Sequence, residues 1–208
     1  MRGGIGRAIA LVLAGLVAAS LTGCSGRPSQ QELDGAAAAH AGGIHALAHV
    51  VVPTPEGFEI AAEHRVDACG SLTSDRGGLD DTHLEGYSCA AIRRTVYTPT
   101  TASADDSRYA TALAEIQKAR GLQLDPHGRS ADGSLTVDGK QVRISAMIWR
   151  TADVDVDMLP LWHANQTVLA DDGDLVPKLK KAGSTAPTVL MVTTTVTYFD
   201  RLRSDGAP

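Results

Sequence analysis

The sequence predicts a single α+β domain, in which two main helices pack on one face of an antiparallel sheet of four to five strands. The predicted elements follow in the order helix, strand, strand, helix, hairpin and final strand, so strands are grouped rather than alternating strictly with helices. Of the 208 residues, 43% are hydrophobic and 21% are charged, a balance that supports one domain with a substantial core. No internal repeat and no further linker follows residue 30, so we assign residues 31–208 to that domain.

The first helix is predicted over residues 31–51, where apolar or small side chains recur every three or four positions. These side chains are Leu33, Ala37, His40, Ile44, Leu47 and Val51. Gly35, Gly42 and Gly43 weaken the helical pattern, and Pro53 stops it. Residues 58–67 then alternate between apolar and charged side chains, which is the period of a half-buried strand. A second strand is predicted over residues 87–97.

The later elements are predicted from caps and turns. The second helix begins at a cap formed by Asp105 or Asp106 and ends at Gly121. Asp138-Gly139 separates two segments with apolar side chains and suits the positive φ angles of a type I′ turn, so residues 135–149 are predicted as a hairpin. A short helix is predicted over residues 174–183. Residues 188–199 are rich in Val and Thr and carry no charge, which is typical of a central strand.

Residues 1–23 have the three parts of an export signal. Arg2 and Arg7 lie before or at the start of an apolar stretch over residues 8–17, and small residues follow. The apolar stretch is shorter than the roughly 20 residues that a membrane span needs. It leads to Leu21-Thr22-Gly23-Cys24, which resembles a bacterial lipobox. The alternative is an ordinary cleaved signal with a cysteine there by chance.

The lipobox resemblance implies that Cys24 carries a diacylglyceryl group and that cleavage falls before it. Residues 24–30 are polar and rich in helix breakers, so we expect a lipidated, flexible tether. Without residues 1–23 the chain has 17 basic and 24 acidic residues, a net charge of −7. We therefore expect a protein anchored by lipid to the outer face of the cell membrane, and no nucleic-acid partner.

The remaining cysteines, Cys69 and Cys89, form an even pair in an exported chain. Disulfides persist in oxidising compartments, so we expect these residues to form a bridge. In the chain-entropy model, closing this loop stabilises the fold by roughly 3 kcal/mol.

The lipobox, the alanine-rich first helix, the Cys69 and Cys89 pair, the helix near residues 107–120 and the Thr/Val-rich final strand together resemble the small secreted lipoproteins of actinobacteria. The resemblance implies anchoring on the outer face of the membrane. It implies no catalytic residues.

His45 and His49 are four residues apart on the first predicted helix, so both imidazoles can face one way and bind zinc. The residues between them include no glutamate, so the metalloprotease motif H-E-x-x-H is absent. A third ligand would have to come from His64 or from an acidic side chain. The alternative is that both histidines are polar residues on the solvated side of the helix.

Two tryptophans are the main candidates for a ligand surface. Trp149, Trp162 and His163 lie close in sequence to Met147 and Met158, and together these side chains can line a small apolar groove for a ligand or a peptide. The alternative is ordinary core packing, the commoner use of tryptophan.

The leading functional hypothesis is a lipid-anchored, non-enzymatic domain that binds an envelope protein or a small ligand. We find no catalytic motif, and the sequence predicts no cofactor. The alternative is an envelope enzyme or metal-binding protein that uses His45, His49 and His64.

Overall fold

The computed structural model describes residues 28–75, 82–101, 105–150, 167–173, 175–183 and 186–202. The export signal, the lipobox, Trp162 and His163 lie outside these residues. The elements are α1 (Gln30–His49), β1 (Phe58–Asp75), β2 (Thr82–Pro99), α2 (Asp106–Arg120), β3 (Gln123–Leu124), β4 (Ser130–Val137), β5 (Lys140–Arg150), β6 (Thr167–Asp171), α3 (Leu175–Gly183) and β7 (Thr188–Leu202). None of the described helices is long and apolar enough to cross a membrane.

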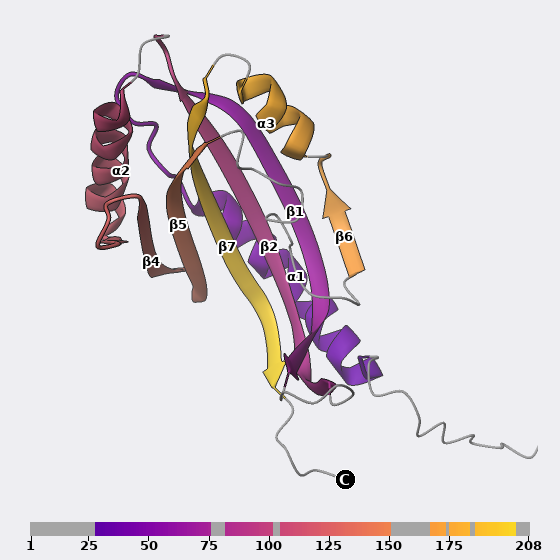
Figure 1. The fold of residues 1–208 in the computed structure, drawn as a ribbon. Helices are drawn as coiled ribbons and strands as arrows, with labels where there is room; N and C mark the ends of the chain where they lie inside the picture. The colour runs from indigo at the N-terminus through magenta and orange to yellow at the C-terminus, as the bar shows by residue number, and fades with distance from the viewer. Residues whose placement is uncertain are drawn as a thin grey trace, which may run out of the picture.

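The strands form one antiparallel sheet in the order β3-β4-β5-β7-β2-β1-β6 (Figure 1). Its centre is built from the long strands β1, β2 and β7, which have 18, 18 and 15 residues. The Val- and Thr-rich β7 pairs with β5 on one side and β2 on the other, as the uncharged sequence of a central strand predicts.

The predicted sheet of four to five strands with two main helices on one face is wrong. In the described residues the structure is mostly β, with seven strands in one sheet and three short helices. Strand β3 has two residues and β6 has five, and all seven residues are exposed. These edge strands therefore lack the alternation of burial that identifies a half-buried strand in a sequence.

The helices lie on both faces of the sheet and not on one face as predicted. Side chains of α1 and α2 share one core with alternate residues of the strands, including Tyr97, Leu190 and Val192. Leu175 and Leu179 of α3 pack with the intervening strand residues Val96, Val189 and Met191, whose side chains point to the opposite face. In Figure 1, α1 lies behind the strands.

Helix α1 begins with a capping box. The Ser29 side chain accepts a hydrogen bond from the backbone N–H of Glu32, and the Glu32 carboxylate accepts one from the backbone N–H of Ser29. The glycines that weaken the helical pattern have a packing role here. A Cβ at Gly43 would lie 2.7 Å from Cδ1 of Tyr198 on β7, so the absence of a side chain lets the helix approach the sheet closely.

The predicted caps and turn are confirmed. Asp105 caps α2 by accepting a hydrogen bond from the backbone N–H of Arg108, and Gly121 ends the helix in a left-handed conformation. Asp138 and Gly139 have φ angles of 50° and 74° and join β4 to β5, as a type I′ hairpin turn requires.

Candidate functional site

The candidate ligand site is a groove along the side of α1 that faces β1 and β6. Helix α1 packs mainly over β7 and β2. Two cavities, of about 310 and 410 Å³, lie beside it, and Asp67 and Ala170 line both. We call these two cavities together the α1 groove. Other residues along it are Leu33, Ala37, Ile44 and Ala48 of α1 and Leu169 of β6.

Large apolar side chains along the α1 groove are open to solvent. Leu33 and Ile44 on α1 are each 40% exposed, and Leu169 on β6 is 53% exposed. Exposed hydrophobic side chains that occur singly are ordinary, but several gathered around one concave surface are typical of a binding site. The α1 groove is therefore the strongest candidate for a ligand site in the part of the chain that the structure describes.

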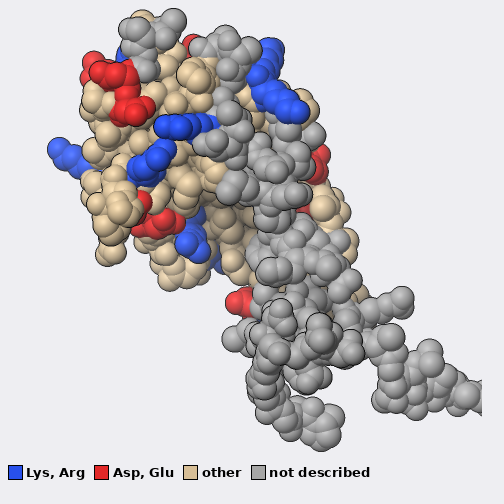
Figure 2. Space-filling model, in the orientation of Figure 1, with Lys and Arg blue, Asp and Glu red and all other residues tan. Residues whose placement is uncertain are grey.

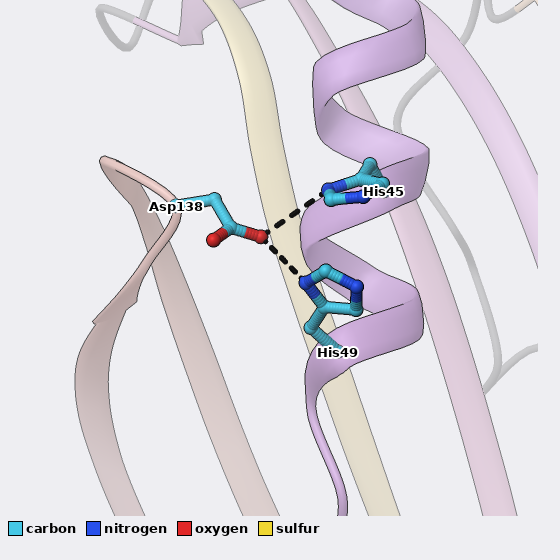
Figure 3. Close-up of side chains that lie close together, drawn as sticks. All are labelled: His45, His49 and Asp138. Atoms are coloured by element: carbon cyan, nitrogen blue, oxygen red, sulfur yellow. Dashed lines mark hydrogen bonds and ion pairs between the residues drawn. The ribbon is translucent and has the colours of Figure 1, made fainter.

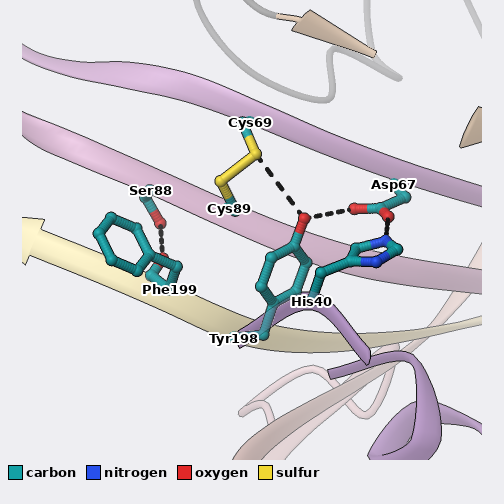
Figure 4. Close-up of a disulfide and its surroundings, with 7 residues drawn as sticks. All are labelled: His40, Asp67, Cys69, Ser88, Cys89, Tyr198 and Phe199. Carbon is teal, nitrogen blue, oxygen red and sulfur yellow. Dashed lines mark hydrogen bonds and ion pairs between the residues drawn. A yellow bond between two sulfur atoms is a disulfide. The ribbon is translucent and has the colours of Figure 1, made fainter. Parts of the chain in front are cut away.

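Three polar side chains that line the α1 groove, Tyr198, Asp67 and His40, contact one another (Figure 4), and we call them the buried polar trio after the buried Asp67 at its centre. The Tyr198 hydroxyl donates a hydrogen bond of 2.7 Å to Oδ1 of Asp67, and Nε2 of His40 contacts Oδ2 of the same carboxylate. Asp67 is 4% exposed, so these two partners compensate for much of the cost of burying its carboxylate. His40, in contrast, is partly exposed and reaches the groove from α1.

The Tyr198 hydroxyl stays a hydrogen-bond donor over the ordinary pH range. Burial raises the pKa of Tyr198 far above its usual value, and the hydrogen bond to Asp67 and the negative charge of that carboxylate raise it further. The carboxylate is thus held between a permanent donor and the His40 ring.

The predicted bridge between Cys69 and Cys89 is confirmed. The two cysteines lie directly opposite each other on β1 and β2, so the disulfide joins neighbouring strands of the sheet. Cys69 also lines the α1 groove, and its sulfur lies 3.7 Å from the Tyr198 hydroxyl. The bridge therefore supports the strands directly beside the buried polar trio.

One end of the α1 groove is charged. Arg65, Arg93, Asp171 and Asp172 line the cavity there. Burial opposes ionisation of Asp172, but the backbone N–H of Arg65 and the ammonium of Lys178 together lower its pKa below the usual value. The α1 groove thus combines apolar walls with ionised groups at one end.

His45 and His49 converge on a third residue, Asp138, which the sequence identifies only as a turn residue. Their Nδ1 atoms lie 3.3 and 2.8 Å from Oδ2 of Asp138, in the turn between β4 and β5 (Figure 3). All three residues are exposed. The hydrogen bond from His49 is the largest of the effects that lower the pKa of Asp138, so its carboxylate is ionised at neutral pH.

The structure does not bring His64 to this pair. His64 is buried on β1, where Nε2 lies 2.9 Å from Oδ1 of Asp171 and Nδ1 lies 3.4 Å from Arg94. It belongs to a separate cluster with Asp171 and Asp172. Of the two sources expected for a third ligand, the acidic side chain is the one that the fold supplies.

Trp149 does not reach the α1 groove. It is half-buried on β5, packs against the cluster that includes α3, and lines a separate cavity of about 300 Å³ on the opposite face of the sheet. The hypothesis of an apolar groove built by Trp149, Trp162 and His163 has two of its three residues outside the described ranges.

The surface charge is mixed. In Figure 2, lysine and arginine side chains are interspersed with aspartate and glutamate over the described part of the visible face. Within that view, the described residues form no continuous basic path of the kind that nucleic-acid binding uses.

Comparison with protein-family models, with curated proteins and with solved structures finds no match to this chain.

Proposed function

We propose that this protein is a lipid-anchored, non-enzymatic binding protein on the outer face of the cell membrane, and that the α1 groove holds a small, mostly apolar molecule. The observation that carries the proposal is the α1 groove itself, in which exposed apolar side chains surround a buried polar trio. The lipobox resemblance at Cys24 supports the location. A groove held beside a membrane by a short tether is well placed to receive amphipathic molecules.

A small molecule fits the α1 groove better than a protein surface does. Its two cavities, of about 310 and 410 Å³, lie in the range of roughly 300–1,000 Å³ found for small-molecule sites. Such sites are mostly apolar and contain a few polar groups that fix the orientation of the ligand. Alanines and leucines supply the apolar walls here, and His40 and Asp67 supply polar groups.

His40 is the residue that we assign to polar recognition. Its Nε2 is held by Asp67, while Nδ1 of the same ring has no partner among the described residues. An imidazole whose Nε2 carries the proton presents Nδ1 as an acceptor. A hydroxyl or amide N–H on the ligand can therefore donate to His40, while the rest of the ligand lies against Leu33 and Leu169.

The proposed ligand site is tested by filling the α1 groove. Ala37 and Ala48 are exposed residues of α1 that line the two cavities, whereas Ala38 is exposed on the same helix and lines neither. We expect Ala37→Phe and Ala48→Phe to weaken binding of the fluorescent probe anilinonaphthalene sulfonate to the full chain by at least about tenfold, because an added ring occupies the site. Ala38→Phe should bind the probe as the unchanged protein does. Equal binding by all three variants would place the site elsewhere.

The proposed anchor is tested separately. Cys24→Ala removes the sulfur that the lipid would occupy, so we expect the variant to leave the membrane fraction while its far-ultraviolet circular dichroism stays unchanged. If the variant remains in the membrane fraction as the original protein does, the protein is held there by something other than a lipid on Cys24.

A further inference from the structure

We propose that His45, His49 and Asp138 form a zinc site that joins α1 to the turn between β4 and β5. This inference is independent of the α1 groove, because the three residues line neither of its cavities. It rests on the convergence of two imidazole nitrogens and one carboxylate from two elements that are far apart in the sequence.

The arrangement of the two histidines is suited to chelation. Residues four apart on a helix lie on one side, one turn above the other, and the two rings have their centroids 4.0 Å apart. Both rings direct Nδ1 toward Asp138, at 3.3 and 2.8 Å from Oδ2 (Figure 3). One ligand atom from each of the three residues lies within 4.8 Å of the others. Zinc bonds to imidazole nitrogen and carboxylate oxygen are about 2.0–2.2 Å, so one ion can contact all three with small side-chain rotations.

Asp138 is held in place by its own backbone. It has a φ angle of 50°, in the left-handed region, and is followed by Gly139 at 74°. These angles are those of the tight turn, so the backbone that carries the Asp138 side chain is fixed relative to β4 and β5. The backbone of a tight turn loses little conformational freedom when a metal binds to its side chain, which favours binding.

The ligand set favours zinc over calcium or magnesium. Imidazole suits zinc and neighbouring transition metals, whereas calcium and magnesium prefer sites made of oxygen atoms. The side chains of His45, His49 and Asp138 are 63%, 51% and 46% exposed, so an ion can enter from solvent without any movement of the core. Three protein ligands leave one position of a tetrahedral zinc for water.

The site is tested on the untagged full chain, purified in detergent and stripped of metal with a chelator. Zinc is titrated by calorimetry, and cobalt is used as a spectroscopic probe whose visible absorption reports the coordination geometry. We expect one ion per chain, and zinc affinity lowered at least about tenfold by His49→Ala and by Asp138→Asn, since each variant removes a ligand. Zinc should also raise the melting temperature, because it binds the folded state, in which the three ligands lie together, and not the unfolded chain.

His127→Ala is the matched control, since His127 is an exposed histidine outside the cluster. It should bind zinc as the original protein does, and an excess of calcium or magnesium should not displace the ion. The inference is overturned if the protein binds no stoichiometric zinc, or if the double variant His45→Ala/His49→Ala binds it with unchanged affinity. Because the three residues are exposed, circular dichroism is expected to show the native fold in every variant.

Discussion

At the scale of single residues, the carboxylate of Asp67 is buried and therefore needs hydrogen-bond partners within the protein. Tyr198 donates to one of its oxygens and His40 contacts the other. The burial of Asp67 is not predictable from the sequence, because Asp67 is one of the charged positions that alternate with apolar ones along the first predicted strand. Asp67 is buried where the side chains of His40 on α1 and Tyr198 on β7 contact it, and the contact with Tyr198 joins residues 131 positions apart.

Tyr198→Phe tests this account of the buried trio. The variant keeps the ring and removes the hydroxyl, so Asp67 loses a donor in a buried place. We expect the free energy of unfolding, measured with urea, to fall by about 1–3 kcal/mol. Tyr87→Phe is the control, because the described residues offer no hydrogen-bond partner to the Tyr87 hydroxyl, and it should change stability by less than about 0.5 kcal/mol. Equal effects of the two variants would mean that the hydrogen bond contributes nothing.

For the cluster of His45, His49 and Asp138, the sequence predicts the histidine pair but not the third residue. The spacing of His45 and His49 on a helix predicts that the rings lie together, because that relation is local. The third residue, Asp138, lies 89 positions after His49, and only the packing of the hairpin beside α1 brings it close. Asp138 is recognisable in the sequence as a turn residue, but the turn motif carries no information about its neighbour.

At the scale of elements, the helix cap, the helix end and the hairpin turn were predicted correctly, because each is determined by interactions between adjacent residues. The cap at Asp105, the end of α2 at Gly121 and the Asp138-Gly139 turn all follow from preferences of a few adjacent residues. The edge strands β3 and β6 depend instead on pairing with a neighbour, since their own residues are exposed. The sequence also did not predict that α3 lies on the second face of the sheet, because helical periodicity does not indicate which face of a sheet a helix covers.

The adjacent glycines of α1 give an element-scale prediction. A Cβ at Gly43 would collide with the Tyr198 ring, whereas a Cβ at Gly42 would make only an ordinary contact with Lys140. We expect Gly43→Ala to destabilise the fold by about 1–3 kcal/mol, as overpacking of a core does. Gly42→Ala should stabilise it by about 0.5–1 kcal/mol, since alanine is the better helix former. Thermal unfolding of the two variants measures both effects, and a stabilising Gly43→Ala would contradict the close helix-to-sheet contact.

At the scale of the whole molecule, the tyrosines report on the integrity of the fold. All four tyrosines of the chain, Tyr87, Tyr97, Tyr109 and Tyr198, are buried. Burial is the largest cause that raises the pKa of each one. They lie on two strands and one helix but belong to the same core, so their ionisation depends on the fold as a unit.

Alkaline titration tests this arrangement. Tyrosines in the unfolded chain ionise near pH 10, whereas those in the fold ionise at higher pH, so the fold favours the protonated form. The stabilisation is complete below about pH 10 and is lost as the pH rises through the folded pKa values. We expect the ultraviolet absorbance of tyrosinate to appear in one step together with loss of circular dichroism. Ionisation near pH 10 with the fold intact would contradict the burial of these rings.

The proposed function combines a lipid anchor at Cys24 with a small molecule bound in the α1 groove. Native mass spectrometry of the full chain, extracted from the membranes of its own host, tests both parts in one experiment. We predict a protein that starts at Cys24, carries acyl chains and holds one small molecule that is released on collisional activation. The variant Ala37→Phe/Ala48→Phe should carry the acyl chains without the small molecule. A chain without acyl groups, or a filled groove that keeps the ligand, would contradict the proposed function.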